Sequence, residues 1–223
     1  MKILGICSSP RLEGNTFYYL NTALSEAEKL GAEIELIKLA GKNISACKAC
    51  YSCVKAKRCV VEDDFQEIAE AMAQADAIVL GVPNYYDVPN ALTHAMLERC
   101  FCFRHQGTFS LKDKPIVILS TGYSKDEENS QVLNIVEHFA NKNKMKVISK
   151  FLVGAFSQCY SCKYGMTCAD GNIVKDNGFV DKITTEMLPP KFKQQENSIL
   201  KCHRAADTIT KLLAMYKERK GVQ

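Results

Sequence analysis

The sequence predicts an α/β fold built on a doubly wound, five-stranded parallel sheet in the order 2-1-3-4-5. Five short aliphatic segments alternate with amphipathic helical segments along the chain. Strands that are buried on both faces give such apolar runs, because helices cover both sides of a parallel sheet. The 223 residues suffice for one core of this kind but are short for two, so we expect a single domain over residues 1–223.

The elements follow from the spacing of the apolar residues. Strands are expected at 2–7, 33–39, 77–82, 115–121 and 146–155. A helix is expected after each of the first four strands, and a last helix carries its apolar face from Ile199 to Tyr216. Asp64 and Glu67 have the spacing of a capping box and predict the start of the second helix.

Two stretches interrupt this alternation. A cysteine-rich loop at 45–62 follows the second strand, and an irregular insertion at 156–197 separates the fifth strand from the last helix. The insertion contains Gly171, Gly178, Pro189, Pro190 and three cysteines. A loop of this length in a compact domain is usually functional or disordered.

The composition indicates the cellular compartment and excludes some classes of binding partner. The 29 Lys and Arg residues against 25 Asp and Glu residues give a net charge of +4 with no long basic block, so we expect neither nucleic-acid nor membrane binding. No apolar run has the length of a signal-peptide core or a membrane span. We therefore expect a cytoplasmic protein, whose 11 cysteines are metal ligands where they cluster and small buried side chains where they are scattered.

The most specific chemical motif is a run of four cysteines. Cys47, Cys50, Cys53 and Cys59 have the spacing C-x2-C-x2-C-x5-C. Thiolates at such intervals on a tight loop can turn toward one point and hold a [4Fe–4S] cluster. Structural zinc sites usually separate two C-x2-C pairs, so the close third cysteine favours the cluster. A structural zinc and a loop that has lost its metal are the alternatives.

The later part of this motif recurs in the insertion. Cys159, Cys162 and Cys168 repeat the spacing of the last three cysteines, with the same Tyr-Ser pair between the first two. In the predicted strand order the two modules leave opposite edges of the sheet, roughly 19 Å apart at about 4.8 Å per strand, so one centre does not use both unless the insertion folds back. We expect these thiols to meet a metal or a redox partner. A second cluster with a fourth ligand from elsewhere, a ligand set shared with another subunit and a reactive dithiol stay open.

The loop from Ser8 to Thr16 leads from the first strand directly into a helix. Backbone N–H groups, the helix dipole and Arg11 favour a phosphate there. The loop lacks both G-x-G-x-x-G and G-x-x-x-x-G-K-[ST], so a monophosphate fits better than a dinucleotide or a nucleoside triphosphate.

Two further loops leave the carboxyl ends of the third and fourth strands. They contain Pro83, Asn84, Tyr85 and Tyr86 in the first and Thr121, Gly122 and Tyr123 in the second. Ligands of doubly wound sheets bind at this edge, where the winding reverses. We therefore expect the three loops to flank one crevice, with the last loop offering backbone N–H groups to the edge of a ring.

On these residues the chain resembles the NADPH-dependent FMN reductases of the flavodoxin-like superfamily, and within them the iron–sulfur flavoproteins. The resemblance extends through about residue 125 and rests on Ser9-Pro10-Arg11 with Gly14-Asn15-Thr16, on the cysteine run leading to Asp63-Asp64, and on Pro83-x-Tyr85-Tyr86 with Glu98-Arg99. His94 and Glu98 depart from the family pattern, where Lys and Asp are frequent, which puts the shared subunit interface in doubt.

The resemblance implies a flavodoxin-like fold that binds FMN. The phosphate would meet Ser9, Arg11, Asn15 and Thr16. The isoalloxazine ring would lie against the loops at Pro83 to Tyr86 and Thr121 to Tyr123. A homodimer or homotetramer is also implied.

We therefore expect an FMN-dependent electron-transfer oxidoreductase with a [4Fe–4S] cluster on the Cys47–Cys59 loop. The flavin carries the catalysis, so no protein acid or base is assigned. The donor is expected to be NAD(P)H or ferredoxin and the acceptor a small molecule, and the sequence identifies neither. The alternatives are a cluster-free NAD(P)H-dependent reductase of FMN, quinones or nitro compounds, and a non-enzymatic, zinc-stapled binding module.

Overall fold

The computed structural model describes residues 1–105, 109–123, 126–155, 157–160, 162–188 and 191–221. Positions 156, 161 and 189–190 of the predicted insertion lie outside the described residues. The five parallel strands are β1 (Lys2–Cys7), β2 (Glu33–Lys38), β3 (Ala77–Tyr85), β5 (Pro115–Gly122) and β6 (Lys146–Gly154). Their order β2-β1-β3-β5-β6 confirms the predicted doubly wound sheet.

A short sixth strand was not predicted. β4 (Val88–Pro89) pairs antiparallel with the end of β3. Tyr86 and Asp87 form the two-residue turn between them, with φ angles of 55° and 63°. The Asn84 amide donates to Asp87 Oδ1 at 3.0 Å. The segment expected to be a rigid turn is therefore a tight hairpin, whose two left-handed residues match the twist of the paired strands.

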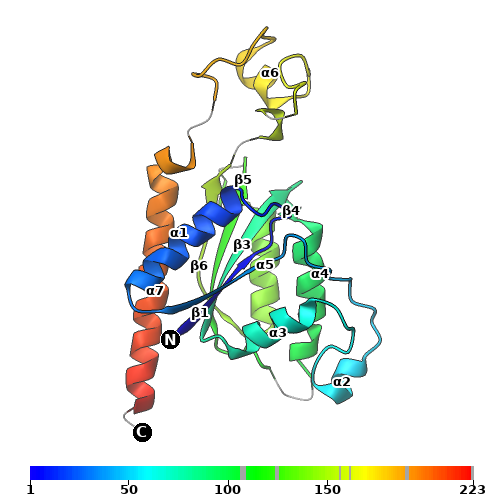
Figure 1. Ribbon diagram of the computed structural model, residues 1–223, viewed down its shortest axis with the longest axis vertical. Helices are drawn as coiled ribbons and strands as arrows, with labels where there is room; N and C mark the ends of the chain where they lie inside the picture. Colours follow the sequence, from blue (N-terminus) through cyan, green and yellow to red (C-terminus); the bar gives the residue numbers. More distant parts are fainter. Residues whose placement is uncertain (106–108, 124–125, 156, 161, 189–190, 222–223) are drawn as a thin grey trace.

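Helices cover both faces of the sheet (Figure 1). The long helices are α1 (Asn15–Lys29), α3 (Phe65–Gln74), α4 (Ala91–Arg99), α5 (Gln131–Lys142) and α7 (Glu196–Gly221). The short helical segments are α2 (Ser52–Ala56), η1 (Cys100–Phe103), η2 (Gln158–Tyr160), α6 (Asn172–Asn177) and η3 (Phe192–Gln194). Within the described ranges, no helix combines the length and apolar character needed to cross a membrane.

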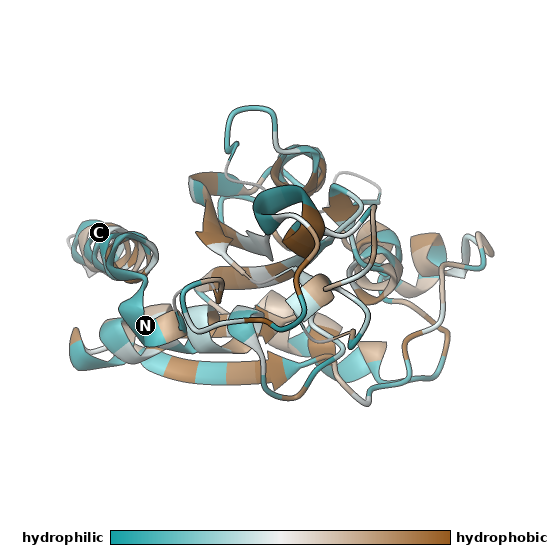
Figure 2. Cartoon of the chain, turned by 90° about the horizontal axis from the view of Figure 1, so that it is seen from above, coloured by the Kyte–Doolittle hydropathy of each residue, from teal (hydrophilic) through white to brown (hydrophobic). Residues whose placement is uncertain are grey.

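Alternate strand residues supply two hydrophobic cores. In β1, Leu4 and Ile6 belong to the core under α3, α4 and α5, whereas Ile3 and Cys7 belong to the core under α1 and α7. All four side chains are fully buried. Figure 2 shows the mainly hydrophobic strands between the two helical layers. Cys202 lies fully buried in the second core, so this cysteine packs as a small apolar side chain.

The capping box predicted for α3 is absent. Asp64 precedes the helix, but its side chain makes no capping bond. Its carboxylate accepts a hydrogen bond from the N–H of Asn43 at 2.6 Å, while Asp63 Oδ1 accepts from the N–H of Phe65 at 3.1 Å. The prediction was wrong because the Asp64 carboxylate binds Asn43, while Asp63 accepts a hydrogen bond at the start of the helix in its place.

Asn90 ties the start of α4 to the loop after β1. Its Oδ1 accepts from the Thr93 N–H at 3.3 Å, and its amide donates to the Ser8 carbonyl at 2.9 Å. The Ser8 N–H donates to the Gly81 carbonyl of β3, also at 2.9 Å. These buried contacts fix the loop against the carboxyl edge of the sheet.

Replacing Asn90 by Ala should lower the free energy of unfolding by about 2–4 kcal/mol, because it removes a helix cap and leaves a buried carbonyl unpaired. Urea unfolding monitored by circular dichroism measures this. Asn21→Ala, on the exposed surface of α1, is the matched control and should stay within about 0.5 kcal/mol of the wild type. Equal effects of the two substitutions would contradict the structural role of Asn90.

Candidate functional site

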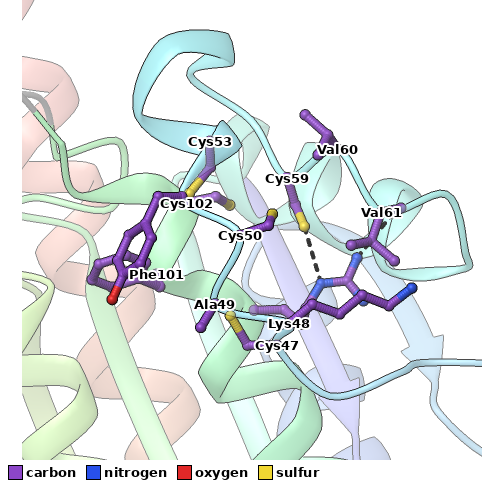
Figure 3. A pocket seen from close by; sticks show the side chains of 12 residues that line it. Cys47, Lys48, Ala49, Cys50, Cys53, Cys59, Val60, Val61, Phe101 and Cys102 are labelled. Atoms are coloured by element: carbon purple, nitrogen blue, oxygen red, sulfur yellow. Dashed lines mark hydrogen bonds between the residues drawn. The ribbon is translucent and has the colours of Figure 1, made fainter.

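The four cysteines of the first module line a single pocket (Figure 3). Cys47 and Cys50 are exposed, Cys53 is partly buried and Cys59 is buried. Cys102, from η1, adds a fifth sulfur to the wall. Spacing alone thus predicted four side chains that the fold does bring to one place.

The backbone of this loop has an unusual conformation. Ala49, Tyr51 and Lys57 lie in the left-handed region, with φ angles of 49°, 57° and 59°. Such angles cost energy in residues other than glycine and are concentrated at functional sites. Backbone N–H groups in alternating right- and left-handed conformations form concavities that bind anions, including iron–sulfur clusters.

The thiols of the pocket influence one another. Hydrogen bonds from the N–H and hydroxyl groups of Ser52 lower the pKa of Cys50. Burial raises the pKa of Cys53, and the negative charges of the other three thiolates of the module raise it further. Burial also raises the pKa of Cys102 to about 11. Cys53 and Cys102 are therefore harder to ionise than Cys50, and a metal that binds Cys53 has to displace its proton.

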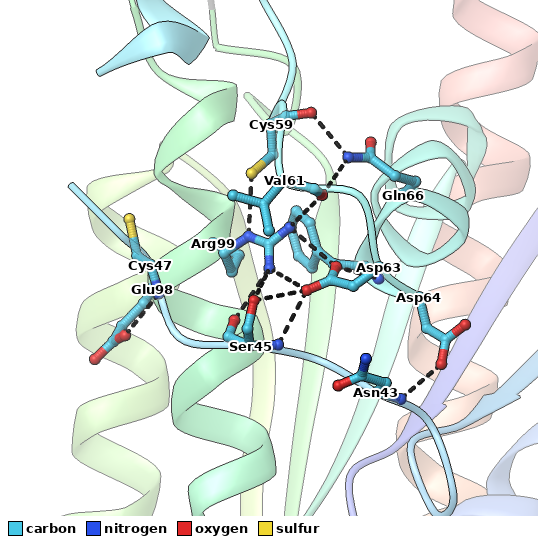
Figure 4. A network of polar contacts seen from close by, with 11 residues as sticks. Asn43, Ser45, Cys47, Cys59, Val61, Asp63, Asp64, Gln66, Glu98 and Arg99 are labelled. Carbon is cyan, nitrogen blue, oxygen red and sulfur yellow. Dashed lines mark hydrogen bonds and ion pairs between the residues drawn. The ribbon is translucent and has the colours of Figure 1, made fainter. Parts of the chain in front are cut away.

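Arg99 connects α4 to the cysteine-rich loop (Figure 4). Its Nε donates to Cys59 Sγ at 3.0 Å, and its two terminal nitrogens donate to Asp63 at 2.7 and 3.0 Å. They also donate to the carbonyls of Ser45 and Val61, both at 3.0 Å. One guanidinium thus joins the start of the loop, at Ser45, to its end, at Val61 and Asp63.

The Arg99–Asp63 ion pair is almost fully buried, with side chains 1% and 4% exposed. Burial opposes ionisation of Asp63, but the hydrogen bonds from Arg99 and Ser45 outweigh it and hold the pKa of this carboxyl well below its usual range. Burial likewise opposes the charge of Arg99, yet Asp63 and Cys59 raise the pKa of the guanidinium. Both groups therefore stay charged at neutral pH.

Three residues of this site were not assigned a role from the sequence: Arg99, Cys102 and His105. His105 Nε2 lies 3.2 Å from Cys53 Sγ. A signal for Arg99 does exist, because it follows the buried Met96 by three positions and therefore shares the inward face of α4. Cys102 and His105 offer no such signal, since only the chain path after α4 brings them to the loop.

The described residues contain no three His, Cys, Asp or Glu side chains close enough together to hold one metal ion. This applies to both cysteine modules. In the second module Cys159 is partly buried, whereas Cys162 and Cys168 are exposed. None of its three sulfurs belongs to a hydrophobic core.

The three loops expected to flank one crevice meet at the carboxyl edge of the sheet. The hydroxyl groups of Thr16 and Thr121 lie 2.6 Å apart. A Cβ atom on Gly122 would lie 2.8 Å from the Cβ of Asn84, so glycine is required where these two loops touch. The fold thus brings the predicted phosphate and ring loops together.

The phosphate loop differs in detail from the expectation. α1 begins without a side-chain cap, which leaves its first backbone N–H groups available to a ligand. Arg11 is exposed and Asn15 is partly exposed. Ser9 is 5% exposed, and its hydroxyl accepts a hydrogen bond from the Arg11 N–H at 3.2 Å. Thr16 is buried, and its hydroxyl lies against that of Thr121. The Thr16 side chain is therefore engaged in packing the loops together.

Three tyrosines of the ring loops reach solvent. Tyr85, Tyr86 and Tyr123 are 45%, 100% and 50% exposed. The Tyr123 hydroxyl donates to Asp176 Oδ2 of α6 at 2.8 Å. This bond raises the pKa of Tyr123 and links the insertion to the ring loop.

These structural features define a doubly wound α/β protein whose three loops meet at the carboxyl edge of the sheet and whose cysteine-rich loop forms a separate pocket. The family described as NADPH-dependent FMN reductase matches residues 1–158. The chain belongs to this family.

Curated relatives carry a more specific name. An "Iron-sulfur flavoprotein" of Archaeoglobus fulgidus is 32% identical over 136 residues, which cover 61% of this chain and 62% of that protein. An iron–sulfur flavoprotein of Methanocaldococcus jannaschii is 32% identical over 66% of this chain and 76% of the relative. The match to the Archaeoglobus protein thus spans less than two thirds of its length.

Solved structures share the fold. A flavodoxin from the domain Archaea has a TM-score of 0.53 at 11% identity, covering 96% of this chain and 99% of its own. The NAD(P)H:quinone oxidoreductase from Methanothermobacter marburgensis has a TM-score of 0.59 at 14% identity, covering 92% and 97%. The flavodoxin-like fold expected from the sequence is confirmed.

Replacing Asp63 by Asn should lower the free energy of unfolding at pH 7 by about 3–5 kcal/mol, because the buried charge of Arg99 loses its partner. The wild type should lose this contribution as the pH falls below about 4, the ordinary pKa of a carboxyl group, because the unfolded state then takes up a proton that the folded state resists. Urea unfolding at pH 7 and below pH 4 measures both effects.

The exposed neighbour Glu62 provides the matched control for this prediction. Glu62→Gln should leave stability at pH 7 within about 0.5 kcal/mol of the wild type. If Asp63→Asn were as stable as Glu62→Gln, the ion pair would not hold the loop.

Proposed function

We propose that this protein is an FMN-binding electron-transfer oxidoreductase that carries a [4Fe–4S] cluster on the Cys47–Cys59 loop. Electrons pass from NAD(P)H or ferredoxin to a small-molecule acceptor, and the protein acts as a homodimer or homotetramer. The observation that carries the proposal is the convergence of four cysteines with cluster spacing on one pocket.

The residues of the pocket fit an iron–sulfur cluster better than a single zinc ion. A cubane distributes its four cysteine ligands over four irons, whereas zinc gathers them at about 2.3 Å from one ion. All four sulfurs line one pocket, and the close third cysteine of their motif is unlike the two separated pairs of a structural zinc site. The Arg99 Nε–H offers a hydrogen bond to Cys59 Sγ, and such bonds set the potential of a cluster. The name of the relatives supports the same centre.

The carboxyl edge fits a flavin mononucleotide. The uncapped start of α1 and the exposed Arg11 offer N–H donors and a positive charge to one phosphate. Asn84 holds the hairpin on which Tyr85 and Tyr86 reach solvent, where they can pack against a ring. The backbone of Thr121 to Tyr123 borders the same edge. Together these residues bind the phosphate and orient the ring.

When bound, FMN exchanges one or two electrons and the cluster passes one at a time, so the pair converts two-electron to one-electron chemistry. The protein supplies binding and orientation. Arg99 keeps the thiolate of Cys59 hydrogen-bonded, and Glu98 accepts a hydrogen bond from the Cys47 N–H at 3.3 Å, which holds the loop on α4.

The cluster assignment predicts the effect of removing single sulfurs. Replacing Cys47, Cys50, Cys53 or Cys59 by Ala should abolish the iron and acid-labile sulfide of this site and its low-temperature spin-resonance signal, while FMN stays bound through other loops. The matched control is Cys102→Ala, which removes a sulfur from the same pocket but stands outside the motif, and should keep the cluster. Zinc in the anaerobically prepared wild type, in place of iron at this loop, would favour the zinc-stapled alternative.

The phosphate assignment predicts that Arg11→Ala weakens FMN binding by about 1.5–3 kcal/mol, which is the scale of a charge-assisted hydrogen bond. Quenching of flavin fluorescence during titration of the apoprotein measures this affinity. Arg219→Ala, at the exposed end of α7, should bind FMN like the wild type. If Arg11→Ala bound FMN with the affinity of the wild type, Arg11 would not bind the phosphate.

A further inference from the structure

The cysteines of the insertion lie outside the region shared with the family. The family match ends at residue 158, and Cys159, Cys162 and Cys168 follow it. The segment that carries them lies between β6 and α7 and extends beyond the carboxyl edge of the sheet, around α6 (Figure 1). The chemistry of the family therefore does not account for this second module.

The insertion has almost no hydrophobic core of its own. Within its described residues, 157–160, 162–188 and 191–197, only Ser157, Gly165, Gly171 and Ile173 are buried. Ile173 is the one apolar side chain among them that can anchor packing. Units of this size without a core are usually stabilised by a metal or by disulfides.

The backbone nevertheless folds into a compact unit around the cysteines. A Cβ atom on Gly165 would collide with the carbonyl oxygen of Cys159 and would lie 2.7 Å from Ile173 Cδ1. The Cys168 N–H donates to the Tyr164 carbonyl at 3.1 Å, and its own carbonyl accepts from the Gly171 N–H at 2.8 Å. These contacts bring the two ends of the Cys-x2-Cys-x5-Cys motif onto the same small unit.

The surroundings of Cys159 suit a metal ligand, and the other two thiols can move toward it. Cys159 Sγ accepts a hydrogen bond from the N–H of Asn172 at 3.3 Å, as metal-bound thiolates do. Lys163, directly after Cys162, has a left-handed φ of 70° that turns the chain back toward the unit. Cys162 and Cys168 are exposed, so their side chains can rotate toward Cys159 without disturbing packing.

We propose that Cys159, Cys162 and Cys168 bind a second, thiolate-ligated metal centre, which completes the fold of the insertion. Three soft thiolates select iron–sulfur clusters or zinc over hard cations. The repeat of the first module's spacing favours iron and sulfide, with one coordination position left for solvent or another ligand. Binding couples to closure of the three side chains, as in other small metal-folded units.

The second centre lies beside the carboxyl edge. The Ala155 N–H donates to the Gly122 carbonyl at 3.1 Å, and Asp176 of α6 accepts from the Tyr123 hydroxyl at 2.8 Å. Gly122 and Tyr123 both belong to the loop assigned to the flavin ring. At this position the centre can pass electrons to FMN. That role rests on the proposed function, whereas metal binding by the three cysteines does not.

Metal analysis of the full chain, purified without air, tests the proposal. Iron, acid-labile sulfide and zinc per chain are compared in the wild type, in Cys162→Ser/Cys168→Ser and in the matched Cys47→Ser/Cys50→Ser variant, which also changes two exposed cysteines. The wild type should hold metal beyond the four irons of one [4Fe–4S] cluster. The second-module variant should lose that excess, and the matched variant should keep it.

Excess iron with sulfide identifies a cluster, excess zinc identifies a structural zinc, and either supports the proposal. Equal metal contents in the wild type and in the second-module variant would overturn it, as would a disulfide between these cysteines in the wild type. If the first cluster does not form, the wild type and the Cys47→Ser/Cys50→Ser variant will contain equal iron. If FMN does not bind, the purified protein will contain no flavin. These two results concern the proposed function and are distinct from the loss of the second centre.

Limited trypsin digestion gives a readout that is independent of metal analysis. The second-module variant should be cleaved after Lys163, Lys175 or Lys182 roughly tenfold faster than the wild type, because cleavage follows the population of the open segment. The sheet and α7 should resist equally in both proteins. Cleavage of the insertion at the wild-type rate would contradict a metal-stabilised unit.

Discussion

The buried ion pair between Arg99 and Asp63 is the interaction on which the cysteine-rich loop depends. Hydrophobic burial does little for this loop, because most of its residues are exposed or only partly buried and three of them have left-handed backbones. Arg99 reaches from α4 into the loop and binds Asp63, two backbone carbonyls and Cys59. A buried charge that is fully hydrogen-bonded in this way specifies one loop conformation. Through Arg99, the helix α4 thus holds the loop that positions the cysteines.

The helix α4 also separates the two candidate cofactor sites. Asn90 at its start contacts the phosphate loop, and Arg99 at its end contacts the cysteine pocket. The nine residues of α4 span about 14 Å at about 1.5 Å per residue. The first cysteine module therefore lies away from the carboxyl edge. The insertion that carries the second module contacts this edge, because Asp176 of α6 accepts a hydrogen bond from the Tyr123 hydroxyl.

Apolar periodicity predicted the five parallel strands because β1, β3 and β5 are buried between two helical layers, and the edge strands β2 and β6 keep partly buried apolar residues. It missed β4, since a strand of two residues has no periodicity and its turn places Tyr86, not glycine, at positive φ. Cysteine spacing predicted which side chains would share a pocket but not that Arg99 would bind Cys59, a contact between residues 40 positions apart. The family resemblance implies that Thr16 meets the phosphate, and this stays a prediction. The sequence did not indicate that the Thr16 hydroxyl also meets Thr121, which lies 105 residues away.

The most direct test of the account is a crystal structure of the anaerobically prepared protein with anomalous diffraction measured at the iron absorption edge. We expect iron density in the pocket lined by Cys47, Cys50, Cys53 and Cys59. We also expect FMN with its phosphate at the start of α1 and its ring at the loops after β3 and β5. A pocket that holds zinc, or four sulfurs without metal, would contradict the cluster. A flavin bound elsewhere than the carboxyl edge would contradict the cofactor site.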